Sequence, residues 1–98
     1  MSGDVFDPAA DGWTDIGCGV WIMTFTEGNS QTPGGLIEAH RNAAGEWCQG
    51  AIHFSGRGHS TPPLWDVVNA TPLTLSPSLL CRTCGHHGFI RDGKWVPA

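Results

Sequence analysis

The chain has 98 residues, enough for one domain, and its formal net charge is −4, with nine acidic residues against five lysines and arginines. This balance argues against binding to nucleic acid or to an anionic membrane surface, because both need a basic patch. Charged residues are only 14% of the chain. The chain has five tryptophans and no tyrosine. We therefore expect a domain that needs a dense core or a protein partner for its surface.

The pattern of the chain is that of short strands separated by turns, and no stretch keeps a helical period over eleven or more residues. Residues 1–12 have the composition of an irregular lead, and residues 13–98 read as one β domain. Strands are predicted, in chain order, at residues 13–16, 20–26, 36–40, 47–54, 64–68, 73–76, 88–91 and 94–96. Loops are predicted at residues 27–35, 42–45 and 55–63.

The last two strands flank Asp92-Gly93, which is a favoured pair for a two-residue hairpin of type I′. Fourteen glycines and seven prolines add frequent turn signals. The expected fold is a small single-domain all-β structure, an antiparallel sheet stabilised by zinc, with a C-terminal hairpin.

The most informative segment is Cys81-Arg82-Thr83-Cys84-Gly85, which is followed directly by His86 and His87. Two thiolates at this spacing can close on one tetrahedral zinc ion, and Gly85 permits the tight turn behind them. A pair of reduced, half-buried thiols is the plain alternative. A redox dithiol fits less well, because such a motif opens a helix in a βαβ pattern and none follows here.

Two further cysteines compete for the remaining ligand positions. Cys48, which follows a predicted turn, is the preferred third ligand, and Cys18 is the alternate. If both bind, the site is Cys₄ and the histidines stay free. Among the histidines, His87 is preferred over His86, because the chain can curl back three residues after Cys84.

Three other histidines fit the metal site less well. His53 is a further alternate ligand, although it reads, like His40, as a strand residue that faces solvent or caps a polar group in the core. His59 reads as a loop residue. Separately, Trp47, Trp65 and Trp95 are candidates for an aromatic ligand patch, and their alternative role is to fill a small core.

The C-terminal half resembles a known family. The Leu75-Ser76-Pro77-Ser78 segment, the cysteine knuckle, the run His87–Ile90 and Trp95 together resemble small proteins of the DUF6527 type, found in actinobacteriophages and bacteria. The resemblance covers about residues 47–98. It implies a phage or prophage accessory protein with zinc held by Cys48, Cys81, Cys84 and His87. A more distant similarity is to the β-tent group of zinc folds, in which one metal clamps two hairpins, so the expected sheet is zinc-ribbon-like or β-tent-like. The chain has one C-x-x-C pair where those folds usually have two.

These observations favour a non-enzymatic module in which structural zinc replaces missing core and the surface binds a protein or a small ligand, in the virion or in host takeover. The alternative is a zinc enzyme with Cys48, Cys81 and Cys84 as ligands, an open water position, and His87 or Glu46 as general base.

A third hypothesis is nucleic-acid binding through the knuckle. Arg82, Arg91 and Lys94 lie near it in the sequence, and Phe89 or Trp95 can stack on a base. The overall acidity counts against this hypothesis. Because residues 1–13 lack the charged and apolar regions of a signal peptide, and no apolar run has the length of a membrane span, we expect the cytoplasm of a host cell or a virion.

Overall fold

A computed structural model describes residues 5–26 and 31–98, and the regular elements in this part of the chain are all β-strands. In chain order they are β1 (Thr14–Gly17), β2 (Val20–Thr26), β3 (Pro33–Arg41), β4 (Trp47–His53), β5 (Asp66–Ala70), β6 (Leu73–Ser76), β7 (Leu79–Leu80), β8 (His87–Arg91) and β9 (Lys94–Pro97). The all-β prediction is confirmed. Residues 1–4 of the expected lead and residues 27–30 of an expected loop lie outside the described residues. None of the described segments is a helix long and apolar enough to span a membrane.

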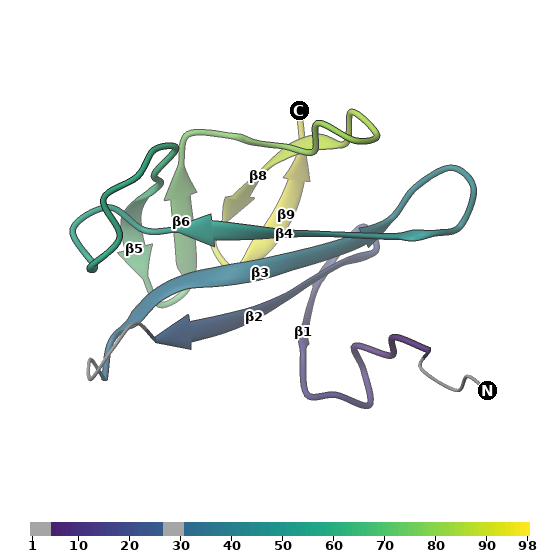
Figure 1. The fold of residues 1–98 in the computed structure, drawn as a ribbon, viewed down its shortest axis with the longest axis horizontal. Coiled ribbons are helices and arrows are strands. Elements are labelled where there is room, and N and C mark those ends of the chain that lie inside the picture. The colour runs from purple at the N-terminus through teal and green to yellow at the C-terminus, as the bar shows by residue number, and fades with distance from the viewer. Residues whose placement is uncertain (1–4, 27–30) are drawn as a thin grey trace.

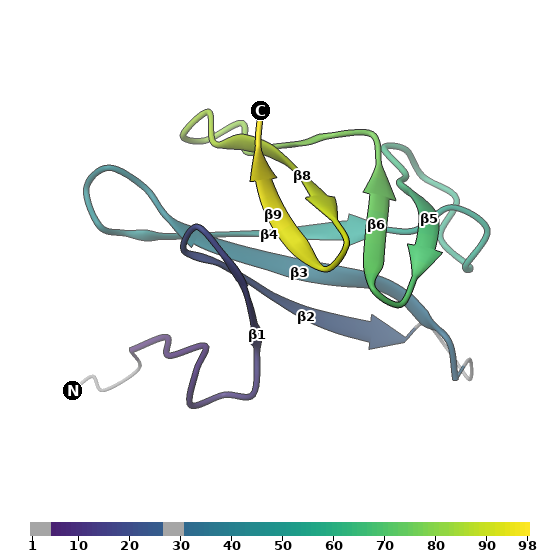
Figure 2. The ribbon, with the colours of Figure 1, turned by 180° about the vertical axis from the view of Figure 1, so that it is seen from behind.

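The strands are arranged in two layers. One layer is an antiparallel sheet with the order β1-β2-β3-β4, so β4 is an edge strand. The other layer holds the β5-β6 hairpin and a three-stranded sheet with the order β7-β8-β9. In Figure 1 the second layer lies behind β2, β3 and β4, and Figure 2 shows it from the opposite side, in front of them.

The core lies between these layers and follows from the alternation of side chains along each strand. On β2, Val20 and Ile22 are buried, and Leu36 on β3 stands opposite Ile52 on β4. Ile90 and Trp95 are register partners in the C-terminal hairpin and are both buried. The buried apolar cluster consists of Ile16, Val20, Ile22, Leu36, Ile52, Phe54, Leu75, Leu79, Ile90 and Trp95.

The local predictions differ from the structure mainly at strand ends. β3 begins three residues earlier than expected, at Pro33, and β5 begins at Asp66 instead of residue 64. Trp65 instead forms a parallel bridge with Phe54, just beyond β4. At the predicted type I′ turn, Asp92 has φ 51° and Gly93 has φ 75°, as that turn requires.

Gly88 provides a test of the packing between β8 and β9. A Cβ atom at this position would lie 2.4 Å from Cζ2 of Trp95 and 2.7 Å from the carbonyl oxygen of Val96. Gly88→Ala is therefore expected to lower the free energy of unfolding by about 1–3 kcal/mol, a typical cost of overpacking. Chemical denaturation measures this loss.

Gly50 supplies the matched control, because a Cβ atom there would meet nothing within 4 Å. Gly50→Ala should leave the free energy of unfolding within about 0.5 kcal/mol of the parent. Equal losses in the two variants would contradict the packing described for Gly88.

Candidate functional site

The stretch from just before β7 to the first residue of β8 carries four chemically active side chains at a regular spacing of three residues: Ser78, Cys81, Cys84 and His87. The middle of this segment is a closed turn. Cys81 N–H donates to the carbonyl of His86 at 2.8 Å, and Gly85 N–H donates to the carbonyl of Cys81 at 2.7 Å. We call residues 81–86 the knuckle. Its two ends continue directly into β7 and β8.

The knuckle thiols meet two side chains from the other layer. The ligand atoms of His40, Cys48, Cys81 and Cys84 all lie within 4.8 Å of one another. His40 on β3 and Cys48 on β4 are register partners, which puts their side chains on the same face of the sheet. These four residues, which we call the metal cluster, therefore join the first sheet to the knuckle.

The donor set of the metal cluster fits a tetrahedral metal ion. One imidazole and three thiols form one of the common structural zinc sets, in which zinc–sulfur distances near 2.3 Å place neighbouring sulfurs about 3.8 Å apart. His40 Nε2 lies 3.2 Å from Sγ of Cys84. The geometry shows that this cluster can hold a metal ion.

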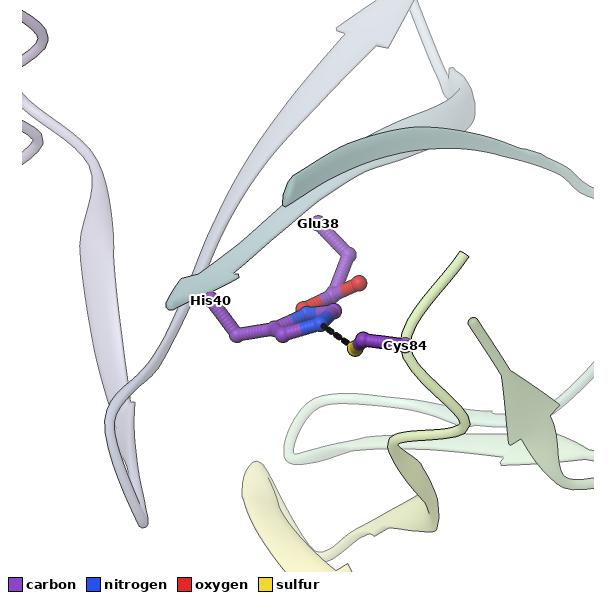
Figure 3. Close-up of polar contacts among 3 residues, drawn as sticks. All are labelled: Glu38, His40 and Cys84. Atoms are coloured by element: carbon purple, nitrogen blue, oxygen red, sulfur yellow. Dashed lines mark hydrogen bonds and ion pairs between the residues drawn. The ribbon is translucent and has the colours of Figure 1, made fainter. Parts of the chain in front are cut away.

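Glu38 fixes the orientation of His40. Figure 3 shows the Glu38 carboxylate and the Cys84 thiol on opposite sides of the imidazole. Glu38 Oε2 accepts a hydrogen bond from His40 Nδ1 at 2.6 Å, and both residues are buried. With a metal ion bound, the proton would stay on Nδ1 and the lone pair of Nε2 would bind the metal, which is the usual arrangement of a metal-binding histidine and its supporting carboxylate.

Two thiols of the metal cluster, those of Cys48 and Cys84, have pKa values shifted in opposite directions. The hydrogen bond from His40, followed by one from the backbone of His86, lowers the pKa of Cys84 to about 7. Burial, followed by the hydrogen bond with Cys84, raises the pKa of Cys48 to about 11. A thiolate therefore forms first at Cys84, and metal binding must displace the proton held at Cys48.

The pKa values of the supporting pair also depart from their ordinary ranges. Burial raises the pKa of Glu38, although its hydrogen bond to His40 acts in the opposite direction. For His40, burial acts to lower the pKa, but the hydrogen bonds to Cys84 and Glu38 outweigh burial and raise it.

The structure brings together three of the four predicted metal ligands, Cys48, Cys81 and Cys84, and replaces the fourth. His87 is absent from the metal cluster, and His40 occupies the place expected for it. His87 lies outside the metal cluster because the chain has already entered β8 at this residue. His87 is the first residue of β8 and pairs with Leu80, and its ring contacts Ser78 instead.

The alternate ligands lie elsewhere. Cys18 is exposed in the turn between β1 and β2, where its φ is 55°. His86 stacks between His40 and Trp95, with centroid distances of 4.2 and 4.8 Å. His53 stacks on His59 at 3.6 Å.

The three tryptophans of the predicted aromatic patch are separated. Trp47 packs against Phe6, with ring centroids 4.9 Å apart, and under the guanidinium of Arg41. Trp95 belongs to the core, and Trp65 donates its indole N–H to the carbonyl of Ser78 at 3.2 Å. Trp65 thus holds the backbone of Ser78 in place.

The contact between Ser78 and His87 brings a hydroxyl group and an imidazole together. Ser78 Oγ and His87 Nε2 are 2.8 Å apart, within hydrogen-bond distance, and His87 is exposed to solvent. A serine hydroxyl bonded to an imidazole is the minimal pair of nucleophile and general base. No hydrogen bond of His87 Nδ1 is found within residues 5–26 and 31–98, so the arrangement there is a dyad. Ser78 also lines a cleft of about 520 Å³ between the two layers.

A comparison with protein families gives this dyad a context. Residues 35–98 match the model of the family described as bacterial ubiquitination-like system serine protease, BubE. The chain belongs to the BubE family. The matched region runs from β3 to the C-terminus and includes both the metal cluster and the Ser78–His87 dyad. No curated protein and no solved structure matches the chain.

Membership of BubE corrects the functional prediction. A non-enzymatic module built around structural zinc is wrong for a chain that belongs to a family of serine proteases. The expectation that the chain is not an enzyme has no support for the same reason. Sequence reasoning missed the dyad because it treated His87 as a metal ligand and Ser78 as part of a family motif. The available signal was the spacing of three residues from Ser78 to Cys81 and from Cys84 to His87.

Metal content distinguishes the two histidines. His40→Ala removes a donor atom from the metal cluster and is expected to lower the bound metal well below one ion per chain, whereas His87→Ala should keep it. Elemental mass spectrometry on protein purified without a metal-affinity tag measures both. Cys84→Ser and Cys18→Ser form a second matched pair, in which only the first should lose metal. Loss of metal in His87→Ala alone would restore His87 as the ligand.

Proposed function

We propose that the chain is a serine hydrolase that cleaves peptide bonds, with Ser78 as nucleophile and His87 as general base. The single observation that carries this proposal is the 2.8 Å contact between Ser78 Oγ and His87 Nε2, in a chain that belongs to a serine protease family. The described residues offer no second hydrogen bond between a serine and a histidine.

The chemistry follows from the two side chains. As Ser78 Oγ attacks the carbonyl carbon of the substrate, its proton passes to His87 Nε2, and a tetrahedral oxyanion forms. The intermediate collapses when the bond to the leaving amine breaks, and His87 donates its proton to that amine. A water molecule then attacks the acyl-serine, again losing its proton to His87, and the carboxylic acid product leaves while Ser78 regains its proton.

Zinc is the ion that we propose for the metal cluster. A His and three Cys are four protein ligands, which complete the tetrahedral coordination typical of structural zinc. When bound, the ion would tie the knuckle to β3 and β4. The role left to the chain's own residues is positional, because Cys81 and Cys84 each lie three residues from one member of the dyad. Holding both thiols at one point limits the relative movement of Ser78 and His87.

The description of the BubE family refers to a bacterial ubiquitination-like system. We extend that setting to this chain and infer a protein substrate instead of a small molecule. The half-buried position of Ser78 along a cleft of about 520 Å³ is consistent with a segment of polypeptide lying next to the Ser78 side chain.

The phage or prophage origin expected from the sequence stays a prediction.

A fluorophosphonate probe tests the dyad without knowledge of the substrate, because it phosphonylates an activated serine. The probe is expected to label Ser78, and His87→Ala should slow labelling by at least about a hundredfold, as loss of a general base does. Ser78→Ala should abolish labelling. Intact-protein mass spectrometry follows the reaction, and peptide mapping locates the adduct.

Ser76→Ala is the matched control, because Ser76 lies two residues away, is exposed on β6, and belongs to the same sequence motif. It should label at the rate of the parent. Labelling that survives Ser78→Ala but disappears in Ser76→Ala would move the nucleophile to Ser76 and contradict the proposal. All variants are compared at equal metal content and melting temperature.

A further inference from the structure

The cleft at Ser78 is lined by residues of two strands. One wall is formed by Gln49, Gly50 and Ala51 of β4, and the other by residues 78–83, which include β7. Both β4 and β7 are edge strands of their sheets. The cleft therefore lies between two edge strands, and Ser78 is among its lining residues.

Within residues 5–26 and 31–98, no strand pairs with the outer edge of β4 from Trp47 to Ala51. Phe54, just beyond β4, donates its N–H to Gly34 on the β3 side, whereas the His53 carbonyl accepts from Trp65 on the opposite side. Backbone groups alternate between the two sides along a strand, so Gln49 and Ala51 share the outward direction of His53. Among the described strands, β3 is the only neighbour of β4.

This edge already pairs with a backbone segment at one end. Trp65 N–H donates to the His53 carbonyl at 2.9 Å, and Ser55 N–H donates to the Trp65 carbonyl at 2.8 Å. Pro63, two residues earlier, also lines the cleft but has no N–H to donate. The edge thus remains available from Ala51 back toward Trp47.

The side chains next to this edge leave room for an added strand. Gly50 stands opposite Glu38 in the register, and a Cβ atom at Gly50 would meet nothing within 4 Å. Gln49 and Ala51 are exposed, and Ala51 is small. An incoming backbone can therefore approach the edge without displacing a large side chain.

We propose, as an extension of the proposed protease function, that the substrate is an unfolded peptide segment that binds as an added strand on the outer edge of β4. Its backbone pairs with the N–H and C=O groups of Gln49 and Ala51, and its scissile carbonyl lies at Ser78. Recognition by strand addition depends on main-chain hydrogen bonds, so the segment must be extended and free of its own secondary structure.

The protein-side test replaces the outward N–H of Ala51. Ala51→Pro removes this donor, and a proline is tolerated on an edge strand where the N–H faces solvent. The control Ala51→Ser keeps the N–H. The substrate is a peptide library made by digesting a bacterial proteome, with cleavage products identified by mass spectrometry and the fastest substrate then synthesised for kinetics.

Ala51→Pro is expected to lower kcat/KM for that peptide by about five- to tenfold, the effect of one lost hydrogen bond, while Ala51→Ser stays near the parent. Fluorophosphonate labelling of Ser78 should be unchanged in both variants, because the probe has no backbone to pair. Equal peptide cleavage by Ala51→Pro and the parent would overturn the inference and leave the dyad standing.

The substrate-side test leaves the protein untouched. N-methylation of successive amides in the synthesised peptide should slow cleavage at alternate positions, since only every second residue of a strand points its N–H toward β4. A uniform effect along the peptide would overturn strand addition. If protein whose Ser78 can be labelled cleaves no peptide in the library, an extended peptide alone is not a substrate, and the inference is overturned. Absence of labelling would refute the dyad itself.

Discussion

The contact between the knuckle and the first sheet is the constraint on which the site depends. Cys81 and Cys84 from one layer meet His40 and Cys48 from the other, with all four ligand atoms within 4.8 Å of one another. The His40 imidazole is itself held by the buried carboxylate of Glu38. A metal ion at this point would tie together strands that are distant in the sequence, and Ser78 and His87 lie at the two ends of the segment that it would tie.

This arrangement matters for the proposed hydrolase activity. A nucleophile and its base must each stay within a few tenths of an ångström of the position that the reaction requires. A domain of this size has only a limited core to hold them there. Ser78 directly precedes β7, which has only two residues, and β7 contacts the rest of its sheet through β8 alone. Its position is secured by Leu79 in the core, by the Trp65 hydrogen bond and by the knuckle. In the proposed function, the metal therefore takes no part in the chemistry of Ser78 and His87 but helps to hold the two side chains in place.

Sequence reasoning predicted most of the fold, because its signals are local. Asp92-Gly93 predicts a two-residue turn, and the β-branched and aromatic residues from Val20 to Thr26 predict a strand. The partial prediction of the site has a physical cause. Cys81 and Cys84 are neighbours in the chain, but the role of His40 depends on the β3–β4 register that places it opposite Cys48. The pairing of His87 with Ser78 likewise depends on the turn of the knuckle, which no short motif specifies.

The most direct test of this account is the labelling rate of Ser78 by a fluorophosphonate as the metal is removed and returned. We expect one zinc ion per chain, a fall of at least about tenfold in labelling when a chelator removes it, and recovery when one equivalent of zinc is restored. Circular dichroism recorded in parallel shows whether the strands persist. Labelling of Ser78 at an unchanged rate in metal-free protein would contradict the claim that the metal cluster holds the dyad together.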